Sequence, residues 1–365
     1  MANSPINRNW VDVCWGVFTL FAALVMAGRF AMHQKVGVSR FAYKLSLILL
    51  AAYLLRFSVP LLHSNNIQWF PLAMEIKPVF YLLIALVLTS ALRQIDDSIF
   101  LNYACVLAVY LVGELLLKSL VEGTLVRPFG SGEVNYDAAL LVIALVIAYT
   151  SKQKVSQWQM NLVWFGLLIT FSRTSVITAV IVHLCVRKTH FSTLILLLLV
   201  SSSFVLSFLL RDLSLTEVES IDRYLMWVTA IDFIDSDYWG SAFGVFPGNG
   251  LMSIDVPPAL QWLWDRQGDM LGISGVYAFY FHSALLRLTI TWGWVPVLMA
   301  LLWGIYMILS RRISMRLKLL IITTTLLSLT MGVFYLSNVG VIWWLAVLSV
   351  PELMRLRAGR HGKSL

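Results

Sequence analysis

The sequence of 365 residues is poor in charged side chains, which make up 13% of it, against about 25% in an ordinary soluble domain. It also has only three cysteines, too few for a scaffold held together by several disulfides. The shortage of charge excludes a disordered chain and argues against a soluble enzyme. Apolar residues make up 59% of the chain and the mean hydropathy is +0.81. This composition is typical of a membrane protein.

Long apolar runs recur along the chain, and about eleven of them (10–12) qualify as membrane crossings, each of which needs about 20 apolar residues. Lipid admits only helices and closed barrels, and these runs are too uniform for barrel strands. We therefore predict an all-α, polytopic integral membrane protein. The predicted crossings are residues 10–28, 45–62, 71–92, 99–118, 136–150, 160–172, 174–186, 191–210, 284–309, 319–337 and 339–354.

Lysine and arginine are divided unequally between the two sides of this predicted topology. One set of loops and the C-terminal tail hold 17 of the 27 basic residues, and basic loops face the cytoplasm. The C-terminus is therefore predicted to be cytoplasmic, and an odd number of crossings places the N-terminus outside. The formal charge of +8 reflects this orientation and does not indicate a nucleic-acid partner.

The predicted topology divides the chain into three parts. Residues 1–210 form a membrane bundle, which includes a hairpin with two short arms at residues 160–186. Residues 211–282 form the only long external loop, with ten acidic residues and three arginines. Residues 283–365 form the C-terminal membrane helices and a basic cytoplasmic tail. Long loops in compact proteins usually have a function, so we expect the functional residues near residues 211–282.

The external loop contains a predicted amphipathic helix at about residues 216–234. Thr216 and Glu219 form a capping-box pattern at its start. Apolar residues then recur at helical spacing. The predicted apolar stripe consists of Val218, Ile221, Leu225 and Val228, and the opposite face of Arg223, Trp227, Ala230 and Ile234.

Arg173 and His282 are the two most conspicuous polar residues next to apolar runs. Arg173 lies at the turn of the short-armed hairpin, where a charge costs about 2.5–3.5 kcal/mol on insertion scales. Its planar fork suits a phosphate or pyrophosphate, and the alternative is a structural ion pair. His282 ends the external loop, and histidine exchanges protons near neutral pH. The alternative for His282 is a structural role among aromatic residues.

Other charged residues within the apolar runs suggest structural ion pairs. Glu114 and Lys118 are four residues apart and are predicted to pair on one helix face. Arg56 is expected to meet Glu75 or Glu114, and Arg287 to lie at the membrane interface. No motif indicates a metal site or a cofactor, because the acidic triplet Asp235–Asp237 reads best as a solvated turn.

Three motifs occur in a particular order along the chain. Ser172-Arg173-Thr174 lies between two short apolar arms, and Arg223 precedes Trp227 by four residues, with Gly240 and Gly244 beyond. His282-Ser283 then ends the loop, ten residues before Gly293. This order resembles the bacterial O-antigen ligase/polymerase superfamily, which includes Wzy-type polymerases and WaaL-type ligases. The resemblance covers residues 160–300, and the remaining chain is similar in hydropathy.

The resemblance implies a metal-independent, inverting glycosyltransferase of the bacterial inner membrane, with a GT-C-like fold and a periplasmic loop. Its donor would be a glycan on undecaprenyl pyrophosphate. By this resemblance His282 would be catalytic, and Arg173 and Arg223 would bind the pyrophosphate. Secondary candidates for substrate contacts are Arg211, Arg266 and Trp227. A protein that regulates chain length is a further expected partner.

Three functions remain open at this point. A polymerase would transfer the glycan to another lipid-linked repeat unit of O antigen, capsule or exopolysaccharide. A ligase would transfer it to lipid A-core, but Pro296 departs from the last position of the ligase motif that begins at His282. We therefore rank the polymerase first. A transporter of the lipid-linked sugar is the third possibility, and internal repeats, which are common in transporters, are not evident in the sequence.

Overall fold

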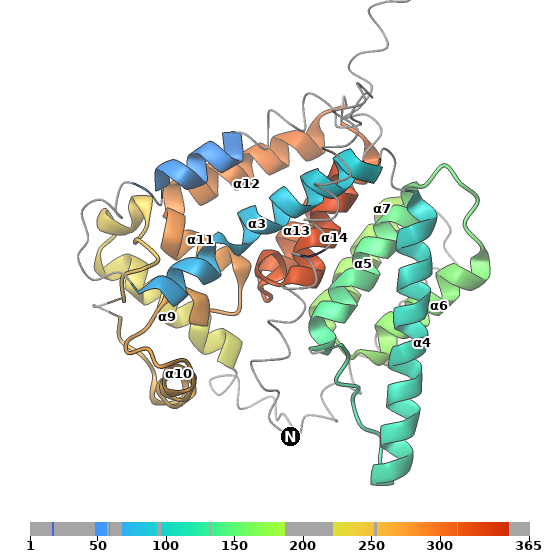
Figure 1. Ribbon diagram of the computed structural model, residues 1–365, viewed down its shortest axis with the longest axis horizontal. Helices are drawn as coiled ribbons and strands as arrows, with labels where there is room; N and C mark the ends of the chain where they lie inside the picture. Colours follow the sequence, from blue (N-terminus) through green and yellow to red (C-terminus); the bar gives the residue numbers. More distant parts are fainter. Residues whose placement is uncertain are drawn as a thin grey trace, which may run out of the picture.

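The computed structural model describes residues 48–56, 68–92, 96–131, 133–186, 222–251, 254–311 and 313–349, with the single residues Val17 and Ser58. All regular secondary structure in these ranges is helical (Figure 1). The longer helices, besides an unlabelled one at residues 48–56, are α3 (Trp69–Leu92), α4 (Asp97–Glu122), α5 (Val134–Thr150), α6 (Gln157–Ile169), α7 (Arg173–Val186), α9 (Asp222–Ser236), α10 (Pro258–Leu271), α11 (Ala284–Trp292), α12 (Trp294–Leu309), α13 (Met315–Ser328) and α14 (Ser337–Leu348).

Two of these helices are long and apolar enough to cross a membrane. They comprise residues Trp69–Thr89 of α3 and Asp97–Glu122 of α4, and α5, α7, α12 and α14 are shorter apolar helices. These features are compatible with an α-helical membrane protein. The predicted crossings at residues 10–28 (except Val17) and 191–210, like the basic tail, lie outside the described residues.

Helix α5 is the centre of the larger hydrophobic core. Every residue from Val134 to Ala148 is buried, because α5 packs against α4, α6, α7, α13 and α14 (Figure 1). A helix that is apolar on all sides belongs in such a central position. Helices α6 and α7 are the two short arms predicted around Arg173, and the chain reverses between them at residues 170–172.

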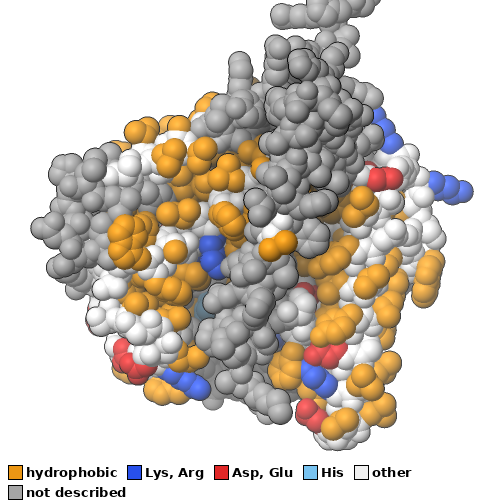
Figure 2. Space-filling model, viewed as in Figure 1, with side chains coloured by type: hydrophobic (Ala, Val, Ile, Leu, Met, Phe, Trp, Pro, Cys, Tyr) orange, Lys and Arg blue, Asp and Glu red, His pale blue; other side chains and the backbone are white. Residues whose placement is uncertain are grey.

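The outer faces of α4 and α12 are apolar and exposed. In α12 no residue is buried, and hydrophobic side chains cover much of α4 in Figure 2. Apolar patches of this extent are rare on soluble monomers and are typical of helices that face lipid. The exposed apolar residues include Ile99, Val106, Val109, Leu116, Leu117, Leu120 and Val121 of α4, and Leu298, Met299, Leu302, Ile305 and Leu309 of α12.

The predicted crossing at residues 284–309 is wrong as a single helix. The chain forms α11 and α12, which are separated at Gly293, where φ is +91°. The reason is a close approach of two backbones, because a Cβ atom at Gly293 would lie 2.2 Å from the carbonyl oxygen of Ala242. Residue 242 belongs to the short 3₁₀ helix η2 (Gly240–Phe243). Hydropathy, which is high on both sides of Gly293, gave no sign of this break.

The predicted crossing at residues 319–337 also ends early. Helix α13 stops at Ser328, and the chain continues through a turn and the 3₁₀ helix η4 (Val333–Tyr335) before α14 begins. The turn at residues 328–332 lies where several other elements meet. We call it the central segment.

A second, smaller core lies within residues 226–290, which include much of the predicted external loop and the start of α11. It joins α9, α10, α11 and the 3₁₀ helix η3 (Ala278–Tyr280). The predicted stripe of α9 is only partly right. Leu225 packs against this core, but the buried residues of the helix are Met226, Thr229, Ala230 and Phe233, and Ala230 was predicted on the opposite face. The helix packs both against this core and against the central segment, so one predicted stripe did not describe it. The predicted start of the helix at residues 216–221 lies outside the described residues.

Candidate active site

The central segment makes four hydrogen bonds to elements that carry candidate residues. The Ser283 hydroxyl donates to the Ser328 carbonyl oxygen (2.7 Å), and the Trp227 indole N–H donates to that of Leu329 (3.0 Å). The Thr330 hydroxyl donates to the Thr174 hydroxyl (3.0 Å), and the Ala284 N–H donates to the Met331 carbonyl oxygen (2.9 Å). Ser283 follows His282, and Thr174 follows Arg173. The central segment therefore gathers three elements that are distant in sequence.

Arg173 is the first residue of α7 and follows a strained turn. Phe171 has a φ of +50° and is buried, a conformation that costs about 1–3 kcal/mol in a residue other than glycine. The N-terminus of α7, where backbone N–H groups lack helical partners, adjoins this turn. Because such a helix end and a guanidinium both favour anions, the position suits a negatively charged group.

Arg127 holds the turn that precedes Arg173. Its Nε donates to the Thr170 carbonyl oxygen and its Nη2 donates to Asn135 Oδ1, both at 2.7 Å. The planar fork of an arginine can reach two acceptors in different directions at once. Arg127 therefore ties the loop after α4 to the start of α5 and to the hairpin turn. No motif in the sequence singles out Arg127, although its place on the external side of the predicted topology was a signal.

Arg223 lies near Arg173 in the structure. Both side chains are half-buried, and the positive charge of Arg223 acts unfavourably on that of Arg173. Two like charges held near each other repel, and a bound anion between them would relieve the repulsion. Trp227 lies one helical turn after Arg223 and is half-buried, with its indole fixed on the central segment.

His282 is exposed and lies between η3 and the N-cap of α11. Ser283 is that N-cap, and its side chain accepts from the Leu286 N–H (3.2 Å). A Cβ atom at Gly332 would lie 3.4 Å from both the His282 carbonyl oxygen and the Tyr136 hydroxyl. The main chain of His282 therefore lies close to the central segment and to the start of α5.

The two secondary arginine candidates do not join this group. Arg266 lies on the exposed face of α10, with its guanidinium 5.7 Å from the ring centroid of Trp262. Trp264, two residues earlier, is buried against Tyr280 and Phe281. Residues two apart point in nearly opposite directions on a helix, so Arg266 faces away from the segment that leads to His282. Arg211 lies outside the described residues.

The sequence predicts only some of the partners of the charged residues within the apolar helices. Glu114 and Lys118 form the expected pair (2.5 Å). Arg56 instead donates from Nη2 to the carbonyl oxygens of Gly244 (3.0 Å) and Thr291 (2.8 Å). The prediction that Arg56 meets Glu75 or Glu114 is therefore wrong, because backbone carbonyls freed near the helix break at Gly293 accept from it.

Glu75 pairs with Arg287. The two residues are 2% and 5% exposed, respectively, and Arg287 Nη2 lies 2.7 Å from Glu75 Oε1. The expected interfacial position of Arg287 is therefore wrong, because its charge is neutralised inside the protein. The two residues are 212 positions apart in the sequence, and no local pattern indicated that they pair.

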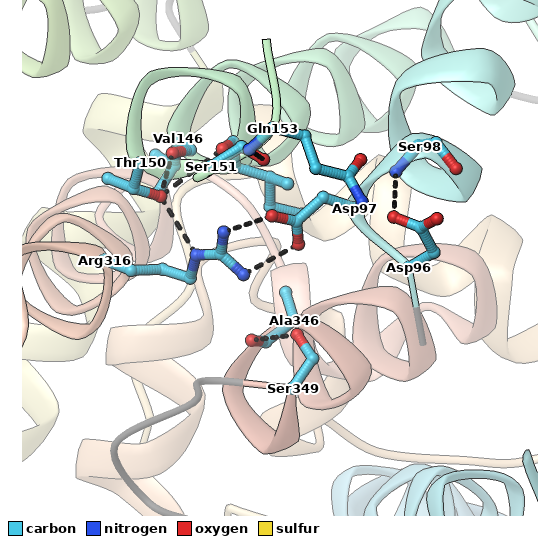
Figure 3. Close-up of polar contacts among 11 residues, drawn as sticks. Asp96, Asp97, Ser98, Val146, Thr150, Ser151, Gln153, Arg316, Ala346 and Ser349 are labelled. Carbon is cyan, nitrogen blue, oxygen red and sulfur yellow. Dashed lines mark hydrogen bonds and ion pairs between the residues drawn. The ribbon is translucent and has the colours of Figure 1, made fainter. Parts of the chain in front are cut away.

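A further, partly buried ion pair fixes the start of α13. Arg316 donates from Nη1 and Nη2 to the two carboxylate oxygens of Asp97 (2.8 and 2.6 Å) and from Nε to the Thr150 hydroxyl (3.0 Å). Figure 3 shows the guanidinium pointing toward both partners, which belong to α4 and α5. This contact ties the start of α13 to the bundle, and α13 ends in the central segment.

A scan against models of protein families, a search of curated proteins and a search of solved structures each found no match.

Proposed function

We propose that this chain is a bacterial surface-polysaccharide polymerase, a glycosyltransferase that uses glycans linked to undecaprenyl pyrophosphate. The acceptor is a second lipid-linked repeat unit of O antigen, capsule or exopolysaccharide. The protein would be a multi-pass protein of the inner membrane with its C-terminus in the cytoplasm. The observation that carries the proposal is the meeting of the elements of Arg173, Arg223 and His282 at the central segment.

The arginine pair supports a pyrophosphate-bearing donor. Arg173 and Arg223 supply two positive charges that act on each other, and guanidinium groups bind phosphate oxygens through paired hydrogen bonds. In the proposed reaction these charges, together with the start of α7, stabilise the negative charge that develops on the leaving pyrophosphate. Arg127 holds the turn before Arg173 and so keeps one of these charges in place.

His282 is the proposed general base. It lies between η3 and the N-cap of α11 and is exposed, so it is accessible to an acceptor hydroxyl. The imidazole accepts the hydroxyl proton while the acceptor oxygen attacks the anomeric carbon of the donor. The new glycosidic bond forms as the bond to the pyrophosphate oxygen breaks. Undecaprenyl pyrophosphate leaves with the bonding electrons, and attack from the opposite face inverts the anomeric centre.

The apolar surfaces support a substrate with a lipid tail. Helices α4 and α12 expose apolar side chains along most of their length. The lipid tail of such a substrate remains in the bilayer. The substrate must therefore enter the protein from the side, through the surface that faces the lipid. An enzyme embedded among lipids, with Arg173, Arg223 and His282 on elements that meet at the central segment, suits this requirement.

Complementation of a null strain tests the proposal. We expect Arg223→Ala and His282→Ala to abolish polysaccharide extension while the protein accumulates normally. Trp262→Ala, which changes an exposed aromatic residue of α10, serves as a control and should preserve extension. Normal chain length in both site variants would overturn the proposal.

The null phenotype distinguishes the polymerase from the other two functions. A polymerase mutant leaves single repeat units on the final acceptor, such as lipid A-core for an O antigen. A ligase mutant instead accumulates polymer that is not attached to lipid A-core. A transporter mutant traps lipid-linked repeat units in the inner leaflet. Either of the last two results would contradict the polymerase proposal.

A further inference from the structure

The ion pair between Glu75 of α3 and Arg287 of α11 lies next to the element that begins after His282. Glu75 Oε1 accepts from Arg287 Nε (3.0 Å) and Nη2 (2.7 Å), and the Met74 carbonyl oxygen also accepts from Nη2 (3.3 Å). Both charged side chains are buried. Arg287 lies five residues after His282, so the pair fixes α11 about one helical turn from its start.

Arg287 also lies next to η4 and the central segment. Its guanidinium carbon lies 3.4 Å from the ring centroid of Tyr335 in η4, a cation–π arrangement. A Cβ atom at Gly332 would lie 4.0 Å from Arg287 Nη1 and 3.4 Å from the His282 carbonyl oxygen. One guanidinium is therefore packed against α3, η4 and the central segment, and the last of these adjoins the main chain of His282.

These contacts lie close to His282 because α11 begins two residues after it. The helix has nine residues and ends at the break at Gly293, and Arg287 is the charged residue among its buried side chains. Its N-terminus is held by Ser283 on Ser328 and by Ala284 on Met331. Together with Arg287, these bonds fix the start of α11 to the central segment and to α3.

Stability alone is a poor explanation for a buried ion pair. Replacing such a pair with well-packed apolar residues is often neutral or stabilising, whereas ionisable groups within membrane helices commonly mark functional regions. We propose that Glu75 and Arg287 are positioning residues that hold His282 in place for the reaction. This inference rests on the proposed function for its catalytic consequence, but its structural consequence is measurable without any activity.

The structural test uses a nitroxide spin label at position 282. The label is attached to His282→Cys in a chain whose Cys14, Cys105 and Cys185 are replaced by Ala. Glu75→Gln keeps the side-chain shape and removes the charge. We expect this variant to increase the mobility of the label in the electron paramagnetic resonance spectrum. Glu114→Gln removes the carboxylate of another ion pair, the Glu114–Lys118 pair of α4, and should leave the spectrum unchanged.

The kinetic test uses the purified chain with native His282 and a lipid-linked repeat unit. A base displaced by about 1 Å can lose about 10²-fold in rate, so Glu75→Gln should lower kcat by about that factor. KM for the lipid-linked donor should not change, because Arg173 and Arg223 belong to other elements. A general loss of structure would instead reduce the amount of folded protein. It would not lower kcat selectively while leaving KM unchanged.

The double variant Glu75→Gln/Arg287→Gln covers the case in which the single variant does not fold. It leaves no buried unpaired charge, and it has the same predicted effects on label mobility and on kcat. An unchanged spectrum at position 282 in a folded variant would overturn the inference, whatever the chain catalyses. Normal polysaccharide from His282→Ala would overturn the proposed function and leave the result of the spin-label experiment standing.

Discussion

Trp227 and Leu329 are 102 positions apart in the sequence, and the indole N–H of Trp227 donates a hydrogen bond of 3.0 Å to the carbonyl oxygen of Leu329. This bond joins helix α9 to the central segment. Arg223 lies one helical turn before Trp227, so the same bond restrains the position of its guanidinium. The candidate site therefore depends on contacts between α9 and the turn after α13.

Replacement of Trp227 tests this connection. Trp227→Phe keeps an aromatic ring but loses the donor, so we expect the free energy of unfolding to fall by about 0.5–1.5 kcal/mol. Polysaccharide extension should also decrease, because α9 loses its attachment to the central segment. Trp262→Phe changes an exposed tryptophan and is the control. Equal stability and extension in both variants would show that the Trp227 bond has no such role.

Arg127 is predicted to act on donor binding through the turn at residues 170–172. Arg127→Lys keeps the charge but cannot reach both the Thr170 carbonyl and Asn135 in the same planar geometry. We expect a higher KM for the lipid-linked donor, because the turn before Arg173 relaxes. Steady-state kinetics of purified protein measure this effect, with Arg266→Lys on the exposed face of α10 as the control. A KM for Arg127→Lys equal to that of the parent chain would contradict the assignment.

Gly293 is predicted to tolerate no side chain. In Gly293→Ala the new Cβ would lie 2.2 Å from the Ala242 carbonyl oxygen at a φ of +91°, so we expect a loss of several kcal/mol or failure to accumulate. Gly123→Ala is a matched control, because φ is +66° there and nothing lies within 4 Å. Its cost should be about 1–2 kcal/mol. Thermal unfolding in detergent compares the two, and similar midpoints would exclude the close approach.

Tyr280 is predicted to make the free energy of unfolding depend on pH in the alkaline range. Burial, followed by the negative charges of Tyr277, Asp265 and Asp269, raises the pKa of Tyr280 to about 12, from 10.0. The folded state therefore retains the proton longer than the unfolded state. This contribution is complete below pH 10 and is lost as the pH rises toward 12. The expected loss is about 1–3 kcal/mol, measured as the fall in free energy of unfolding.

Tyr280→Phe should remove this pH dependence. The hydroxyl is buried and has no hydrogen-bond partner among the described residues, and a buried unsatisfied hydroxyl is destabilising. The variant should therefore be as stable as the parent chain or more stable at pH 7. If the free energy of unfolding of Tyr280→Phe falls between pH 10 and 12 as much as that of the parent chain, another group causes the pH dependence.

Much of the hairpin was predictable from the sequence, because two short apolar runs flank Arg173 and helices α6 and α7 follow those runs. The Glu114–Lys118 pair was predictable for a similar reason, since its residues are one helical turn apart. These features depend on local spacing alone. The helical character of the described residues follows from the same apolar runs.

The helix ends at Gly293 and Ser328 were not predictable from hydropathy. Both lie within apolar runs, and they depend on contacts with residues distant in sequence, such as Ala242 and Trp227. The partners of Arg56 and Arg287 were missed for the same reason, because each lies about 190 residues or more from its partner. The central segment has no motif of its own, and only its hydrogen bonds identify it as the meeting point of the candidate elements.

The most direct test of the proposed polymerase activity is whether the purified protein joins two lipid-linked repeat units. The product is a lipid-linked glycan dimer. The assay supplies one substrate, a repeat unit on undecaprenyl pyrophosphate, and measures the dimer and the released undecaprenyl pyrophosphate. We predict equal amounts of both products from the parent chain and neither product from folded His282→Ala or Arg223→Ala. Dimer formation at the parental rate by both folded variants would contradict the account.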